Sequence, residues 1–149
     1  MKMKNILLCT DGEEQTKKAE EYALTISRGT GASVTALYVV DPFLKKFTNE
    51  IYAVNRDECR EHLDKCLQAE GKAAISAFAA RAAEAAVAAD VLVRFGDPAE
   101  EILKEIDEHQ YAMVIMGSKV LKGWKERFES FKLSEKVFKK CPIPLLVVR

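Results

Sequence analysis

Short apolar runs alternate along this chain with segments of helical period, and this alternation limits the fold more than any other feature. The apolar runs end at turns built on Gly, Asp or Pro, and they span 5–9, 33–40, 90–95, 112–116 and 142–148. Continuously apolar strands are typical of parallel sheets that are buried on both faces. The helical segments between them cover 13–28, 57–89, 97–111 and 133–140. This order predicts an α/β fold, a five-stranded parallel sheet with helices on both faces.

Length and charge restrict the class of protein. A chain of 149 residues suits one domain, covering 1–149. Lys and Arg together number 23, as do Asp and Glu, so the formal net charge is zero and nucleic-acid binding is not expected. No apolar leader precedes the first strand, so we expect a cytoplasmic protein with reduced thiols. The alanine-rich stretch 73–89 carries charges and is too short for a membrane span, so no membrane partner is expected.

The longest predicted helix covers 57–89 and has eleven alanines after Gly71. Glycine weakens a helix, so we expect a bend near Gly71. Its apolar stripe consists of Leu63, Leu67, Ile75 and Phe78. Two other segments, 43–55 and 119–132, lack a sustained period, and we expect them to be mainly loops.

The order and spacing of four short sequences resemble those of the universal stress protein family over nearly the whole chain. These sequences are Ile6-Leu7-Leu8-Cys9-Thr10-Asp11-Gly12, Gly96-Asp97-Pro98-Ala99-Glu100-Glu101-Ile102, Val114-Ile115-Met116-Gly117-Ser118-Lys119, and Ser134-Glu135-Lys136-Val137 followed by Cys141-Pro142-Ile143-Pro144-Leu145-Leu146-Val147-Val148. The resemblance implies a flavodoxin-like sheet, of the adenine nucleotide alpha hydrolase-like type, with strand order 3-2-1-4-5. It also implies a homodimer formed through the last strand. Ligands of such sheets bind beyond the carboxyl ends of the strands, where the strand order reverses.

The loop after the fourth strand departs from the pattern of the family members that bind ATP. The resemblance implies Gly-x2-Gly-x9-Gly-[Ser/Thr] there, and Gly117 matches the first glycine. Val120 stands at the position of the second glycine, and Phe131 and Lys132 stand at the positions of the last Gly-[Ser/Thr] pair. The stretch between Val120 and Phe131 is one residue longer than the pattern allows. Glycine lets the backbone turn its N–H groups onto phosphate, whereas a valine or phenylalanine side chain crowds that approach. We therefore expect impaired ATP binding.

A remnant of the nucleotide site is still implied by the resemblance. Asp11 matches a contact to adenine or ribose, and Val40 matches a backbone contact to adenine. The full set of remnant positions is Asp11, Val40, Met116, Gly117, Lys119, Gly123 and Lys132. The lysines of this loop keep an attraction for anions, so ATP stays a possible cofactor. The alternative for Asp11 is a structural role as the cap of the first helix.

Three soft metal ligands lie at helical spacing in the long helix. Cys59, His62 and Cys66 occupy positions i, i+3 and i+7, which suits zinc or copper. A structural zinc site needs four ligands, and no fourth is evident in the sequence. A metal or redox module is therefore an alternative, set against an ordinary half-buried stripe.

No arrangement of nucleophile, base and orienting group is evident in the sequence, so no enzyme is expected, with slow ATP hydrolysis left open. The leading hypothesis is a non-catalytic, homodimeric stress-response protein that acts through an unknown protein partner. The aromatic segment 43–52 and the loop with Trp124, Phe128 and Phe131 are its candidate recognition surfaces. The alternative for both is a lid over the site. A sensor that binds ATP or AMP through a rearranged loop is the other main hypothesis.

Overall fold

Five parallel strands form one sheet in a computed structural model that describes residues 2–11, 14–40, 56–118 and 133–149; the side chains of Gln15 and of most of 56–70 lie outside this description. The strands run in the order β3-β2-β1-β4-β5, which confirms the predicted order. Their bounds are β1 (Asn5–Cys9), β2 (Ser33–Val40), β3 (Ala89–Phe95), β4 (Met113–Gly117) and β5 (Leu145–Val148). β5 is shorter than predicted, since proline has no N–H for a ladder and Pro142 and Pro144 both precede it.

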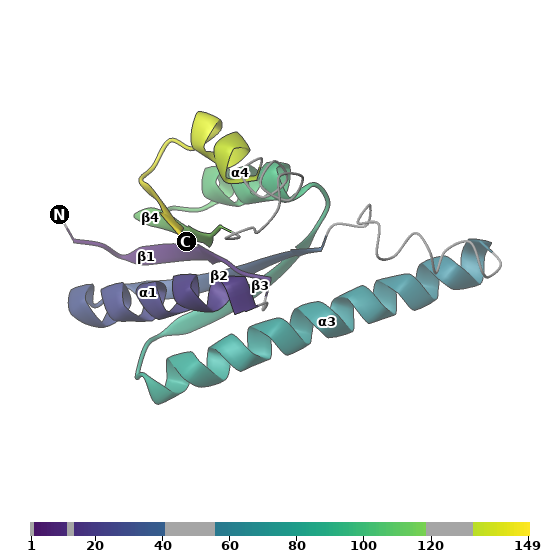
Figure 1. Cartoon of the computed structure of the whole chain (residues 1–149), viewed down its shortest axis with the longest axis horizontal. Helices are drawn as coiled ribbons and strands as arrows, with labels where there is room; N and C mark the ends of the chain where they lie inside the picture. The colour runs from purple at the N-terminus through teal and green to yellow at the C-terminus, as the bar shows by residue number, and fades with distance from the viewer. Residues whose placement is uncertain (1, 12–13, 41–55, 119–132) are drawn as a thin grey trace.

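Helices cover both faces of the sheet, as the apolar runs predict. In Figure 1, α1 (Glu14–Thr30) and α3 (Arg56–Glu84) lie on one face, and α4 (Pro98–Glu108) lies on the other with the helix at 133–140. Successive side chains of β1 pack alternately into the cores on the two faces of the sheet. Ile6 and Leu8 belong to the core that includes Phe78 of α3, while Leu7 belongs to the core that includes Ile102 of α4. The period of two residues along a strand explains this division.

The long helix is straight, so the predicted bend at Gly71 is wrong. α3 is a single helix of 29 residues, about 43 Å at the usual rise per residue, and Figure 1 shows it extending past the sheet. Gly71 instead allows α3 to approach the sheet closely. A Cβ there would lie 3.1 Å from Cδ1 of Tyr38 and 3.5 Å from Cγ1 of Val93. The absent side chain therefore lets α3 lie against β2 and β3.

The end of α3 is formed without glycine. Ala86 has φ of 55°, the N–H of Val87 donates to the carbonyl of Ala82 at 2.9 Å, and that of Ala86 donates to Ala83 at 3.1 Å. These are the bonds of a Schellman motif, which usually has glycine at the left-handed position. The alanine run after Gly71 predicts helix up to residue 89, but the helix ends at Glu84 because Val87 turns into the core.

Candidate functional site

The carboxyl ends of β1, β2 and β4 meet at one edge of the sheet. β1 is the central strand, and Cys9 near its end is in register with Leu37 of β2 and Met116 of β4. The chain crosses from one side of β1 to the other between β3 and β4, so the strand order reverses at β1. Such a reversal is where open α/β sheets bind ligands. Asp11 follows the end of β1, and Gly117 ends the neighbouring strand β4, so both residues lie at this edge.

The predicted site residues that the structure describes differ in how far they reach solvent. Asp11 is exposed, whereas Val40 and Met116 are each 2% exposed. The Met116 side chain belongs to the core beneath α4, and Met116 is paired with Cys9 of β1 and Val147 of β5. The Val40 carbonyl accepts a hydrogen bond of 3.0 Å from the Gly96 N–H. Lys119, Gly123 and Lys132 lie outside the described residues, as do Val120 and Phe131.

The Asp11 carboxylate belongs to a network of side-chain hydrogen bonds. Thr16, in the first turns of α1, donates to Asp11 Oδ1 at 3.0 Å. The Thr16 hydroxyl oxygen lies 3.1 Å from that of Thr10, the residue that follows β1. Thr10 donates in turn to Glu20 Oε1 at 2.7 Å. Both threonines are buried, so the network continues from an exposed carboxylate into the interior.

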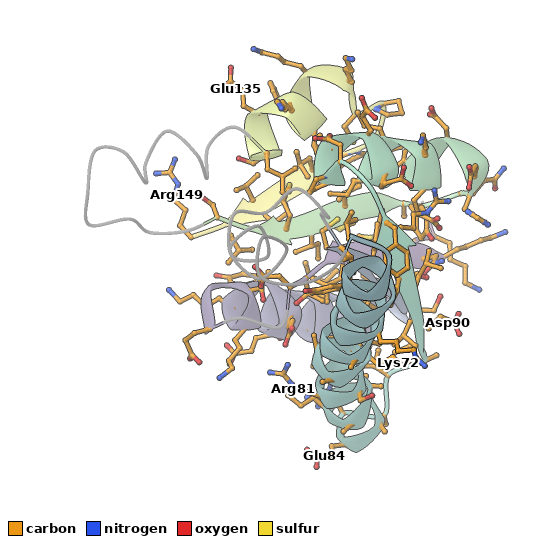
Figure 2. All side chains as sticks on the ribbon, turned by 90° about the vertical axis from the view of Figure 1, so that its right-hand side faces the viewer. Lys72, Arg81, Glu84, Asp90, Glu135 and Arg149 are labelled. Atoms are coloured by element: carbon orange, nitrogen blue, oxygen red, sulfur yellow. The ribbon has the colours of Figure 1, made fainter. Side chains whose placement is uncertain are left out.

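An ion pair between a buried carboxylate and a partly exposed arginine ends this network. Glu20 is 1% exposed, and its other carboxylate oxygen pairs with the guanidinium of Arg81 from α3. Figure 2 shows Arg81 on the side of α3 that faces α1. A buried carboxylate is costly unless it is paired and hydrogen-bonded, and Glu20 has both kinds of partner. The pair thus ties α1 to α3 beside the site.

The chemistry of this edge favours a neutral polar group over an anion next to Asp11. A carboxylate only accepts hydrogen bonds, which suits the hydroxyls of a sugar or the amino group of a base. The same charge repels phosphate. An anionic group of a ligand would therefore lie away from Asp11.

Sequence reasoning missed a second polar cluster, located between β3 and α4. Arg94 of β3 is 17% exposed, and its Nε donates to Glu105 Oε2 at 3.0 Å. Its Nη1 donates to Glu101 at 3.2 Å, and its Nη2 pairs with Glu108. The signal was present in the sequence, because glutamates at i, i+4 and i+7 lie on one helix face.

Glu105 is the buried centre of this cluster. The Tyr111 hydroxyl donates to Glu105 Oε1 at 2.6 Å, and His109 Nδ1 lies 3.0 Å from the same oxygen. Burial and the adjacent carboxylate raise the pKa of Tyr111 well above its usual value. Among the described residues, Glu105, Glu108 and His109 have ligand atoms within 4.8 Å of one another. Arg94 already occupies the two carboxylates, so the group is an ion-pair network that joins β3 to α4.

The cysteines divide between the core and α3. Cys9 and Cys141 are free thiols packed against the core beneath α4. Burial, with a smaller contribution from Cys141, raises the pKa of the Cys9 thiol to about 12. Cys59, His62 and Cys66 lie within α3, but their side chains are outside the described residues. Their metal site stays a prediction, without support from the described part of the chain.

Cys9 is expected to resist alkylation in the native protein at pH 8. With a pKa of about 12, only about one thiol in ten thousand is then ionised, and the thiolate is the reactive form. Iodoacetamide labelling read by peptide mass spectrometry should modify Cys9 only after unfolding. Rapid labelling of Cys9 in the native protein would contradict this expected resistance to alkylation.

The raised pKa of Cys9 in the folded protein also means that folding favours the protonated thiol. The contribution of Cys9 to the free energy of unfolding is therefore retained below the unfolded pKa near 9 and falls as the pH rises from 9 toward 12.

Comparisons with known proteins agree over the length of the chain. The model of the universal stress protein family matches residues 2–149. Universal stress protein YxiE of Bacillus subtilis is 28% identical over 149 residues, covering 97% of each chain. In the part of the chain that the structure describes, no helix has both the length and the apolar character needed to cross a membrane.

Solved structures show the same fold. Universal stress protein UspA from Lactobacillus plantarum is 22% identical, with a TM-score of 0.78 over 100% of this chain and 99% of that one. A universal stress protein family member from Arabidopsis thaliana, solved with AMP bound, is 16% identical, with a TM-score of 0.70 over 97% and 90% of the two chains.

Proposed function

This chain belongs to the universal stress protein family, and from that premise we propose that it is a non-catalytic stress-response protein with an impaired nucleotide-binding loop. One observation carries the proposal. Val120, Phe131 and Lys132 replace the residues with which ATP-binding members are expected to hold phosphate, and the spacing is one residue too long. Backbone N–H groups bind phosphate tightly only where the chain can approach it closely, so this loop should hold a triphosphate poorly.

In this proposal, the part of the site that would contact the nucleoside keeps more of the expected residues than the loop that would hold phosphate. Asp11 offers an exposed carboxylate one strand away from Val40, the position expected to contact adenine. The AMP-bound Arabidopsis relative supports the idea that this fold accepts an adenine nucleotide. We therefore expect weak binding of AMP and little additional affinity from the two further phosphates of ATP.

Isothermal titration with ATP and AMP tests the proposal on the purified full chain. Both ligands are expected to bind weakly and with similar affinity, since the loop adds little for the β- and γ-phosphates. ATP binding at micromolar or better affinity would overturn it. At most slow hydrolysis of ATP is expected, and release of phosphate at a rate typical of ATP-hydrolysing enzymes would contradict the non-catalytic assignment.

A ligand sensor is the second candidate, favoured by the AMP found in the Arabidopsis relative. The four lysines at 119, 122, 125 and 132 would then hold the phosphate through side chains in a rearranged loop. Native mass spectrometry of protein taken directly from cells separates the two candidates. An adenine nucleotide retained through purification would favour the sensor.

The proposed homodimer uses β5, which lies at one end of the sheet. An edge strand presents unpaired backbone groups, and Val147 of β5 is 37% exposed. A second copy of β5 would cover both features. The cytoplasm is the proposed location, and the candidate recognition surfaces for a protein partner, 43–52 and 124–131, lie outside the described residues.

Val147→Lys is expected to convert the dimer to a monomer of 16.7 kDa, because a charge at the strand edge opposes strand pairing. Val91→Lys is the matched control. Val91 is 48% exposed on β3, the strand at the other end of the sheet. Light scattering coupled to size exclusion measures both masses. A monomeric wild type, or dissociation by Val91→Lys instead, would refute the β5 dimer.

A further inference from the structure

We propose that a second copy of this chain docks on two exposed aromatic side chains beside β5, Tyr22 on one face of the sheet and Phe138 on the other. The inference rests on the proposed homodimer and goes beyond its strand pairing, because it assigns the side chains that make the pairing stable. Among the residues that the structure describes, five large apolar side chains are exposed. Three of them, Tyr22, Phe138 and Val147, lie on β5 or on the two helices beside it.

Tyr22 lies on the side of α1 that faces β5. Glu20 of α1 pairs with Arg81 of α3, and Tyr22 follows Glu20 by two residues, about 200° around the helix axis. Tyr22 is therefore turned away from α3. Lys18, one helical turn before Tyr22, donates to the backbone carbonyl of Arg149, just after β5, at 3.3 Å. Because Tyr22 is 52% exposed, its ring extends into solvent on this side of the helix.

Phe138 lies on the opposite face of the sheet, in the helix at 133–140, and is 71% exposed. It follows Val137, which is fully buried in the core beneath α4. In α1, Glu20 follows the buried Ala19 in the same way and turns toward α3, away from β5. Both helices lead into a parallel strand, so they run in the same direction, but they lie on opposite faces. The same turn therefore directs Phe138 the other way, toward the outer side of β5.

Val147 of β5 extends this surface on the side of Phe138. Leu145 packs against the core beneath α4, and side chains two residues apart in a strand point to the same face. Val147 therefore lies on the face that holds the helix at 133–140. Figure 1 shows the C-terminus between α1 and this helix, and Figure 2 shows Arg149 there from another side. The edge of β5 thus has an exposed aromatic side chain on each face of the sheet.

A second copy fits this surface because the surface is self-complementary. Two β5 strands that pair about a twofold axis run antiparallel. Such pairing places α1 opposite α1 of the partner on one face, and the helix at 133–140 opposite its counterpart on the other. Each aromatic ring then meets an element that carries the same exposed ring.

The strand alone is too short to hold two copies together. β5 has four residues, which is about 13 Å of edge at the usual rise per residue. A stable interface buries roughly 800 Å² on each partner. A tyrosine or phenylalanine side chain buries roughly 150 to 250 Å² when it is fully covered. Tyr22 and Phe138 therefore supply apolar area that backbone pairing along β5 lacks.

Hydroxyl-radical footprinting of the full chain tests the inference, because radicals in the solvent oxidise exposed aromatic side chains and spare covered ones. The wild type is compared with Val147→Lys, the variant expected to be a monomer, and light scattering gives the mass in each sample. Tyr22 and Phe138 should be oxidised several times more slowly in the wild type. Phe95 is the matched control, since it is 46% exposed on β3 at the other end of the sheet and should react equally in both samples.

Substitution measures how much each ring contributes. Tyr22→Ser and Phe138→Ser are each expected to raise the Kd of the dimer roughly 10-fold to 100-fold, the usual effect of truncating a buried aromatic side chain at an interface. Phe95→Ser should leave it unchanged. Sedimentation velocity over a dilution series gives the Kd, and circular dichroism shows whether each variant is folded.

A monomeric wild type, or a dimer that Val147→Lys leaves intact, would refute the proposed β5 homodimer and this surface with it. A wild-type dimer that Val147→Lys dissociates, but in which Tyr22 and Phe138 react as fast as in the monomer, would refute the aromatic surface alone. The footprint needs no substitution at either ring, so it decides the question even where Tyr22→Ser or Phe138→Ser does not fold.

Discussion

Arg94→Met is expected to lower the free energy of unfolding by about 3 to 5 kcal/mol, the usual cost of removing one partner from a buried ion pair. Glu105 is 1% exposed; Arg94 donates one hydrogen bond to Glu105 Oε2 through Nε, and Arg94 Nη2 forms an ion pair with the same oxygen. Methionine fills the space of the arginine stem but leaves this carboxylate without its cation. Chemical denaturation at neutral pH measures the loss.

Glu108→Gln is the matched control, because Glu108 pairs with the same guanidinium but its side chain is 54% exposed. An exposed pair contributes at most about 1 kcal/mol, so this variant should stay close to the wild type. Equal destabilisation by the two variants would contradict the role of Arg94 as the partner of the buried Glu105.

The same cluster makes stability depend on pH. Lys104 and, to a smaller extent, Arg94 lower the pKa of Glu101. A lowered pKa in the folded protein gives a contribution to stability that is present above the unfolded pKa of 4.5 and is lost as the pH falls.

Restoring the glycine pattern is expected to raise ATP affinity roughly 10-fold to 100-fold, the worth of one or two charge-assisted hydrogen bonds from backbone N–H groups. The variant carries Val120→Gly, Phe131→Gly and Lys132→Ser, and lacks Ser130 to correct the spacing. Its loop then has the pattern expected of ATP-binding members. Isothermal titration with ATP measures the gain.

The control for this variant replaces Val120 and Phe131 by alanine and keeps the original spacing. Alanine removes the bulk but not the restriction on positive φ, so it should recover less affinity than glycine. AMP affinity should change less than ATP affinity in both variants. An unchanged ATP affinity after restoration would mean that the side chains at 120 and 131 are not what weakens the site.

The strands could be predicted closely from sequence because each is a continuous apolar run with a turn signal at its end. The predicted β2 bounds match the observed Ser33–Val40. The end of α3 could not be predicted, since only tertiary contacts require Ala86 to leave the helix. Ala86 and its alanine neighbours all favour helix by propensity.

The candidate site was predictable only in part. The resemblance identified Asp11, and the reversal of strand order places it where ligands bind. The hydrogen bonds that lead inward from Asp11 were not predictable, because hydropathy does not favour burial of a glutamate such as Glu20. Tyr22 is 52% exposed and Glu20 is 1% exposed. The reason is Arg81, which arrives from another helix and makes burial of Glu20 tolerable.

The central place of β1 also affects how the chain acquires its structure during synthesis. β1 leaves the ribosome before β4, and the pairing of the two strands joins Ile6 to Met113, about a hundred residues later. At translation rates of roughly 5 to 20 residues per second, the edge of Ile6, Leu7 and Leu8 waits roughly 5 to 20 s for that partner. An apolar strand edge left open for so long is a surface that chaperones bind and that aggregates extend. The chain is therefore most open to aggregation between the synthesis of β1 and that of β4.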